Sequence, residues 1–205
     1  MAYKRTSGSF SSVNQISSTP FTVAFFFMPT ALNGSSFLSY WNAGTSNYSQ
    51  YYNIYYNPLA QGRLSMTAVA SGVNGAIDSN FTPSTSNWNH CAGVFSATNS
   101  RSLYANGVLQ GSSAVNVNPT SLTTSSFCNA DSSVSTSIAE IGIWNAALTA
   151  AEIASLAKGM TCDKVRPQSL VFYAPLVRDL IDAKGGRTIT NNNGATVANH
   201  PRIYP

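Results

Sequence analysis

Short apolar stretches separated by polar turns make up most of the hydrophobic pattern of this chain. The most apolar stretch, residues 21–28 (FTVAFFFM), is aromatic and β-branched and stops at Pro29, which is typical of a central strand buried on both faces. Residues 63–70 alternate instead, with an apolar side chain at every second position from Leu64 to Ala68. This period of two predicts a strand with one face in the core and the other face outside.

Further strands and one tight hairpin follow from the same pattern. Strands are predicted over residues 36–41, 51–56, 88–95 and 138–144. The dipeptide Asn106-Gly107 lies inside another strand-like stretch, residues 103–109, and it predicts a hairpin turn because both residues tolerate positive φ.

One helix is expected after residue 148. Thr149 can cap its N-terminus, and Glu152, three residues later, completes a capping box. Ile153 and Leu156 give the helix one apolar face, and Gly159 is placed to end it. A lone helix among many short strands favours a β-sandwich. The expected core contains Phe25, Phe27, Leu64, Met66, Trp88, Val94, Leu103, Trp144, Ile153 and Leu156.

Several of these segments together resemble a known family. Residues 88–95 (WNHCAGVF), 101–109 (RSLYANGVL) and 138–148 (IAEIGIWNAAL), followed by the capped helix, resemble the laminin-G-like branch of the concanavalin A-like lectin/glucanase superfamily. The resemblance covers roughly residues 10–160. It implies an all-β fold, a concanavalin A-like jelly-roll β-sandwich with one short helix.

The C-terminal part of the chain differs from that family pattern. Residues 170–176 (LVFYAPL) look like the opening strand of a laminin-G-like domain, yet they follow the helix. They either complete the sandwich from the C-terminal side or belong to an appended arm. We divide the chain into a sandwich over residues 1–165 and a strand with an extended arm over residues 166–205, which we expect to complete the same domain.

Composition narrows the range of partners. Only 9% of residues are charged, against about 25% in an average domain, so Ser, Thr, Asn, Gln and Gly must form the surface. The net charge is +4, but the eleven Lys and Arg are scattered, and without a basic stripe we expect no nucleic-acid partner. We also expect no membrane partner, because no apolar run is long enough to span a bilayer, and no signal peptide is visible.

Three cysteines cannot all pair within one chain. Cys91 lies in an apolar strand, where we expect a buried thiol. Cys128 and Cys162 could form a disulfide, but the sequence does not decide this.

The acidic residues disfavour catalysis. Glycoside hydrolases of this superfamily carry a closely spaced acidic strand motif, because two carboxyl groups must face one cleft. This chain has only seven carboxylates, none at a spacing of two on one strand. Glu140 stands alone on its strand, where a solvated or salt-bridged role is expected, and His90 and His200 lack metal-ligand spacing. We therefore predict no catalytic residue and no enzymatic activity.

No cofactor is predicted from these residues. The family resemblance leaves calcium as an alternative, with Asp78 and Asp131 as weak candidate ligands. Calcium prefers several carboxylates, which are sparse here.

An aromatic cluster is the best candidate for ligand binding. Five tyrosines lie between residues 48 and 56, just after Trp41. If Tyr52, Ile54 and Tyr56 face the core, then alternation turns Tyr51, Asn53 and Tyr55 outward. Flat exposed rings can stack on sugars or anchor a protein interface. The predicted ligand-binding residues are Trp41, Tyr48, Tyr51 and Tyr55.

The preferred functional hypothesis combines these features with the C-terminal residues. The C-terminal segment His200-Pro201-Arg202-Ile203 is similar to the C-terminal end of laminin-G-like proteins carried by tailed bacteriophages. We therefore expect a non-catalytic structural protein of a bacteriophage virion, such as a capsid decoration protein, made in the host cytoplasm. The alternative is a carbohydrate-binding module for host or glycan attachment, and a glycoside hydrolase is disfavoured.

The termini are the expected docking elements for capsid or tail proteins. Extended arms can add to the edge of a neighbouring sheet, and nearby basic groups could meet an acidic shell. We expect a homo-oligomer, with a trimer among the options. The predicted interface residues are Lys4, Arg5, Arg202, Ile203 and Tyr204.

Overall fold

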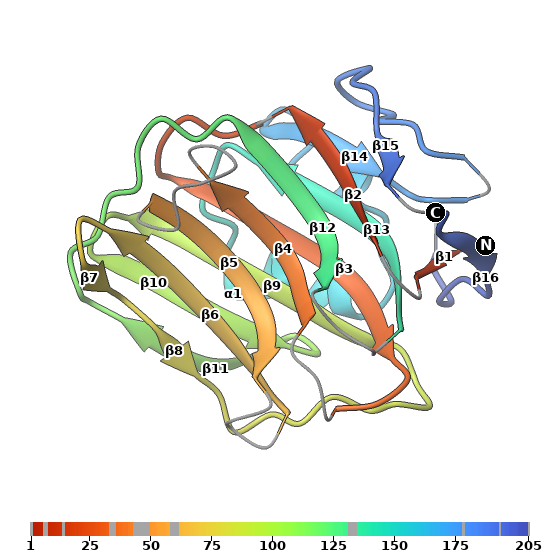
Figure 1. Ribbon diagram of the computed structural model, residues 1–205, viewed down its shortest axis with the longest axis horizontal. Coiled ribbons are helices and arrows are strands. Elements are labelled where there is room, and N and C mark those ends of the chain that lie inside the picture. The colour runs from red at the N-terminus through yellow and green to blue at the C-terminus, as the bar shows by residue number, and fades with distance from the viewer. Residues whose placement is uncertain are drawn as a thin grey trace.

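Two antiparallel sheets lie face to face in the computed structural model of this protein (Figure 1). The structure describes residues 2–5, 8–13, 15–32, 36–42, 50–57, 62–130, 135–177, 179–192 and 194–204. Together with its structural neighbours, this arrangement is a jelly-roll β-sandwich with one short helix, as the sequence predicted.

The first sheet, which we call the helix sheet, has eight strands. Seven follow one another in the order β11 (Val108–Ser113), β10 (Ser100–Ala105), β9 (Asn89–Ala97), β3 (Phe21–Pro29), β13 (Thr136–Trp144), β1 (Ala2–Arg5) and β16 (Thr196–Ala198). The eighth strand, β14 (Leu170–Ala174), pairs with β13. The central strand β3 is buried on both faces, as its apolar sequence predicted.

The second sheet, which we call the tyrosine sheet, also has eight strands. Its order is β15 (Thr190–Asn192), β2 (Gly8–Val13), β12 (Thr124–Ala130), β4 (Ser36–Asn42), β5 (Gln50–Asn57), β6 (Arg63–Ala70) and β7 (Val73–Asn74). The last strand, β8 (Ile77–Asp78), pairs with β6. Residues on β5 and β6 are in continuous register from Gln50 opposite Ala70 to Asn57 opposite Arg63.

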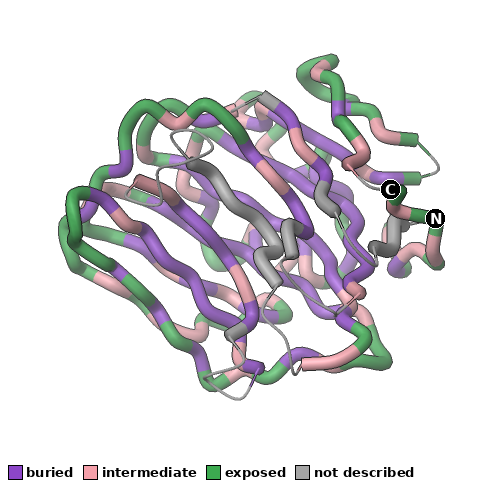
Figure 2. The backbone as a smooth tube through the Cα atoms, viewed as in Figure 1, coloured by how far each residue is buried: buried purple, intermediate pink, exposed green. Residues whose placement is uncertain are grey.

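The main core fills the space between the two sheets, where Figure 2 shows the buried strand segments. A second, smaller core lies on the outer face of the helix sheet, where α1 (Ala150–Ala157) packs its buried Ile153 and Leu156 with Val94 and Trp144. The predicted core residues that are buried are Phe25, Phe27, Leu64, Met66, Val94, Leu103, Trp144, Ile153 and Leu156.

The prediction that Trp88 belongs to the core is wrong, because Trp88 is only half-buried. It precedes the first residue of β9, and Asn89 takes the buried position there. The Asn89 carboxamide accepts from the Ser84 amide at 2.8 Å and donates to the Ser84 and Phe27 carbonyls at 2.8 and 3.3 Å. A polar strand entry therefore replaces the expected aromatic one.

The C-terminal residues contribute to both sheets. Strand β14 extends the helix sheet beside β13, β16 pairs with β1, and β15 pairs with β2 at the edge of the tyrosine sheet. The two chain ends therefore lie close together at one side of the sandwich (Figure 1). The division at residue 165 stays a prediction.

The three cysteines are all buried, and no disulfide joins Cys128 to Cys162. Cys91 points into the main core as predicted. The described helices include none that is long and apolar enough to cross a membrane.

Candidate functional site

The outer face of the tyrosine sheet carries the tyrosines that the sequence singled out. On β5, Tyr52, Ile54 and Tyr56 are buried in the main core, as the alternation predicted. Tyr51 and Tyr55 lie between them in sequence and are half-buried. Because side chains alternate along a strand, these two rings share the outer face with Asn53.

A polar ladder runs across three strands of this face. Tyr55 on β5 is opposite Ser65 on β6, and Ser65 is opposite Asp78 on β8. The Ser65 hydroxyl donates to Asp78 Oδ1 at 2.7 Å, and the Tyr55 hydroxyl hydrogen-bonds with Thr67 and Ser65. Burial, with the nearby Asp78 charge, raises the pKa of Tyr55 despite these bonds, so its hydroxyl stays protonated.

Asn53 lies between the two tyrosines and has an unusual environment. Its side chain is only 3% exposed, yet its Oδ1 atom has no hydrogen-bond partner among the described residues. Buried carboxamide oxygens are nearly always hydrogen-bonded. The Asn53 Oδ1 atom is itself buried, and the residue opposite it on β4, Tyr40, has a side chain that lies outside what the structure describes.

One cation stands at the end of the ladder. Arg63 precedes Ser65 by two residues on β6, so it shares the outer face, and its Nη1 atom donates to Asn80 Oδ1 at 3.2 Å. Arg63 forms no ion pair with any described residue. The face thus offers two aromatic rings, hydroxyl donors, a carboxylate and one guanidinium.

The structure describes the other predicted site residues only in part or not at all. The Trp41 backbone on β4 is opposite Tyr52, but its side chain lies outside what the structure describes, as do Tyr48 and Asp131 as a whole. Within the described ranges, no three His, Cys, Asp or Glu side chains come together as a metal site. Asn53, Ser65 and Arg63 were not among the predicted ligand-binding residues, although the alternation of residues 51–56 and 63–70 already turned them outward.

Glu140 lies elsewhere, in a buried cluster on the helix sheet. It occupies an irregular position of β13 with a φ of 53°, and it is 3% exposed. Its Oε2 atom accepts from the Tyr173 hydroxyl at 2.7 Å, and its Oε1 atom is 3.3 Å from His200 Nε2. Of the two roles expected for Glu140, solvated or salt-bridged, the structure has the salt-bridged one, and its partner His200 was not foreseen.

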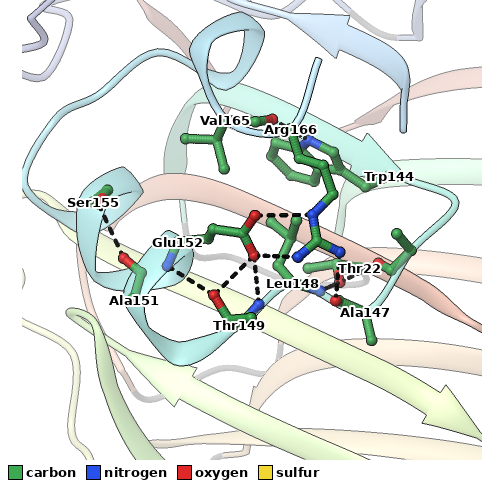
Figure 3. A network of polar contacts seen from close by, with 11 residues as sticks. Thr22, Trp144, Ala147, Leu148, Thr149, Ala151, Glu152, Ser155, Val165 and Arg166 are labelled. Atoms are coloured by element: carbon green, nitrogen blue, oxygen red, sulfur yellow. Dashed lines mark hydrogen bonds and ion pairs between the residues drawn. The ribbon is translucent and has the colours of Figure 1, made fainter. Parts of the chain in front are cut away.

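Glu152 is also committed to a structural role, at the start of α1 (Figure 3). Its carboxylate accepts from the Thr149 backbone amide at 2.7 Å and from Arg166 Nε and Nη2 at 2.8 and 2.7 Å. Burial alone would raise the pKa of Glu152, but these hydrogen bonds hold it below its usual value. The capping box is confirmed, and Arg166 is an addition that sequence spacing does not reveal.

His90 is buried in the helix sheet. Its ring packs edge-on against Phe26 at a centroid distance of 5.0 Å, and burial lowers its pKa to about 3. Cys91 faces the opposite side of β9, in the main core, so the two neighbours do not form a ligand pair.

The predicted interface residues at the C-terminus contact their own chain. The Tyr204 amide donates to the Gly159 carbonyl at 2.6 Å, and the Arg202 guanidinium lies 5.2 Å from the centre of the Tyr204 ring. Lys4 and Arg5 belong to β1, which pairs with β13 and β16. Whether these residues also meet a partner stays a prediction.

One comparison with known proteins shows the family of this chain, and another supports its fold. A family model described as the concanavalin A-like lectin/glucanases superfamily matches residues 5–154. No curated protein matches the sequence.

Several solved structures share the fold at low sequence identity. The heptameric SAP-like pentraxin from Limulus polyphemus is 16% identical, with a TM-score of 0.63 over 97% of this chain and 95% of its own. The CBM40 of Ruminococcus gnavus IT-sialidase, bound to alpha2,3 sialyllactose, is 12% identical, with a TM-score of 0.55 over 75% and 97% of the two chains. The binding domain of Paraclostridial Mosquitocidal Protein 1 is 19% identical, with a TM-score of 0.54 over 73% of this chain and 38% of that one.

Proposed function

Because the chain belongs to the concanavalin A-like lectin/glucanases superfamily, we propose that it is a non-catalytic glycan-binding module. The proposed site is the outer face of β5, β6 and β8. One observation carries the proposal: half-buried Tyr51 and Tyr55 share one sheet face with Arg63 and with the exposed Asp78. The CBM40 neighbour, a carbohydrate-binding module of the same fold, adds support.

The chemistry of this face suits a sugar ring. The apolar face of a pyranose can stack on the Tyr51 and Tyr55 rings, which lose little conformational freedom on binding because each has only two χ angles. A sugar hydroxyl can donate to the exposed Asp78 carboxylate, which already accepts from Ser65. Arg63 offers a donor pair to an acidic sugar such as the one in the CBM40 neighbour.

The carboxylates support a binding role over hydrolysis. Hydrolysis by two acids requires both carboxyl groups to face one cleft. Glu140 is buried against Tyr173, and Glu152 is tied to Thr149 and Arg166. Asp182 is 1% exposed and accepts from the backbone amides that follow it. These three carboxylates therefore hold structure at separate places.

The test is a binding measurement with neutral and sialylated oligosaccharides, for example lactose and sialyllactose. Replacing Tyr51 and Tyr55 together with Ala should weaken binding about tenfold or more, because removing buried aromatic anchors costs above about 1–2 kcal/mol. Tyr55→Phe should retain stacking and lose only the bonds to Ser65 and Thr67.

Tyr104→Ala is the matched control, since Tyr104 is also half-buried but lies on β10 of the helix sheet. It should leave sugar affinity unchanged. If the wild-type chain binds no glycan on an array, the proposal is contradicted. Equal losses of sugar affinity in the Tyr104 and Tyr51/Tyr55 variants would contradict it as well.

The bacteriophage hypothesis remains a second proposal about where such a module works. The hypothesis rests on the low fraction of charged residues and on the resemblance of the C-terminal segment to that of laminin-G-like bacteriophage proteins. A virion location, capsid or tail partners and a homo-oligomer all stay predictions. The pentraxin neighbour, described as heptameric, supports the view that this fold is compatible with a homo-oligomer. Co-sedimentation of the chain with particles would test the location directly.

A further inference from the structure

A pocket opens between the end of α1, the short 3₁₀ helix η2 (Cys162–Lys164) and the C-terminal residues. Its volume is about 490 Å³, and the described residues that line it are Ser155, Lys158, Met160, Lys164 and Tyr204. Pockets that bind small molecules commonly enclose about 300–1,000 Å³. This pocket is not part of the tyrosine sheet, so it is separate from the proposed glycan site.

The wall made by Tyr204 is held in place by backbone contacts. The Tyr204 amide donates to the Gly159 carbonyl at 2.6 Å, and Tyr204 forms a parallel bridge with Met160. Gly159 has a φ of 98°, and a Cβ atom there would lie 2.9 Å from the Arg202 carbonyl oxygen. The glycine that ends α1 therefore also allows the C-terminal residues to approach closely.

Apolar surface is exposed at this pocket. Met160 is 42% exposed and Tyr204 is 53% exposed, on opposite partners of the bridge. A flexible thioether beside a flat ring can accommodate an alkyl chain or another slender apolar group.

Cations surround that apolar surface. Lys158 and Lys164 line the pocket, and the Arg202 guanidinium stacks over the Tyr204 ring. Lys158 and Arg202 form no ion pair with a described residue, and Lys164 reaches Asp163 only at 4.0 Å, with both side chains at least half exposed. An exposed ion pair of this kind, screened by solvent, contributes little to stability.

The C-terminal end of α1 accounts for one of these cations at most. Lys158 caps the helix, where a positive charge offsets the partial negative charge of the last carbonyl groups. That effect fades within one turn and explains neither Lys164 nor Arg202, nor the exposed Met160 beside them.

We propose that this pocket binds a small carboxylate that carries an apolar chain. The carboxylate lies between the ammonium groups of Lys158 and Lys164, and the chain covers Met160 and the Tyr204 ring. Neither the carboxylate nor the apolar chain alone gives tight binding, because exposed ion pairs are weak and the apolar surface of the pocket is small.

The test is an NMR chemical-shift titration of the full chain with octanoate, acetate and 1-octanol. The three ligands separate the contribution of the carboxylate from the contribution of the apolar chain. Octanoate should bind most tightly, and its contacts should perturb Met160, Lys164 and Tyr204. Lys158→Gln combined with Lys164→Gln should weaken octanoate about tenfold and leave 1-octanol unchanged, since it removes the charges but little apolar surface.

Lys184→Gln is the matched control, because Lys184 is exposed and donates to the Pro167 carbonyl instead. It should leave octanoate affinity as in the wild type. Equal affinity for octanoate and 1-octanol, equal affinity for octanoate and acetate, or a loss in the Lys184 variant as large as in the Lys158/Lys164 variant would each overturn the proposal. Both lysines are exposed, so unchanged melting temperatures verify that the variants fold.

Discussion

His200 shows how one side chain can fix its own protonation state. Its Nδ1 atom lies 3.0 Å from the Pro201 carbonyl oxygen, and its Nε2 atom lies 3.0 Å from that of Pro175. Carbonyl oxygens only accept hydrogen bonds, so both contacts need an N–H, and only the imidazolium has two. The Glu140 carboxylate, 3.3 Å from Nε2, then balances the charge.

The groups around Glu140 leave His200 as its counter-ion. Burial, and then the Glu140 charge, raise the pKa of both Tyr173 and Cys162, and Asp163 adds to both effects. Both groups are therefore neutral near neutral pH. Burial alone would lower the pKa of His200, but its bonds to Glu140 and to the two carbonyl groups raise it above the usual value.

The chain should therefore lose stability as the solution becomes alkaline. Since the folded-state pKa of His200 lies above its unfolded value of about 6.5, the contribution is complete below that pH and disappears as pH rises through the folded-state pKa. Melting temperature measured from pH 5.5 to 9 should fall for the wild type and change less for His200→Gln. His90, whose pKa burial lowers to about 3, should not titrate over this pH range when its ring is followed by NMR. A Gln variant with the full wild-type pH dependence would contradict this assignment.

At the scale of elements, α1 illustrates what local sequence can and cannot specify. The Thr149–Glu152 capping box depends on residues three apart, so spacing alone predicts it. The attachment of the helix to the sandwich depends on distant residues: the Thr22 hydroxyl donates to Ala146 and accepts from the Leu148 amide, at 2.7 and 3.0 Å (Figure 3). Arg166 joins the same network from beyond the helix.

Thr149→Ala should lower the free energy of unfolding by about 0.5–2 kcal/mol, because it leaves the Glu152 amide without its capping oxygen. Chemical denaturation monitored by circular dichroism would measure this loss. Ser155→Ala, on the same helix, removes only a bond to the Ala151 carbonyl and should be near neutral. Equal effects of the two substitutions would show that the capping box is not what stabilises α1.

At the scale of the whole molecule, the two ends of the chain close one side of the sandwich. Residues 195–204 supply β16 beside β1, the His200 partner of Glu140 and the Tyr204 wall of the pocket. These residues therefore combine an edge strand, an ion pair and one wall of a pocket.

Deleting residues 195–205 should leave a folded sandwich with a lower melting temperature, because the central strands keep their neighbours while Glu140 becomes a buried carboxylate without a cation. Combining the deletion with Glu140→Gln should recover part of the loss. Loss of all β-structure in the circular dichroism spectrum would show instead that the C-terminal residues are essential for folding. If the chain is a particle protein anchored by this tail, the truncated form should also fail to co-sediment with particles.

The sequence by itself determined the elements whose causes are local. Alternation along residues 51–56 and 63–70 placed Tyr51 and Tyr55 on an outer face, and Asn106-Gly107 predicted the turn between β10 and β11, where both residues have positive φ. Only the tertiary structure decided the contacts between distant segments. Ser65 meets Asp78 through the pairing of β6 with β8, and Glu140 meets His200 across 60 residues because β14 and the C-terminal residues fold back beside β13. The burial of Trp88 was predicted wrongly for the same reason. Which side chain is buried at the start of a strand depends on the hydrogen bonds that the neighbouring backbone needs. There the Asn89 carboxamide hydrogen-bonds with the Ser84 amide and carbonyl groups.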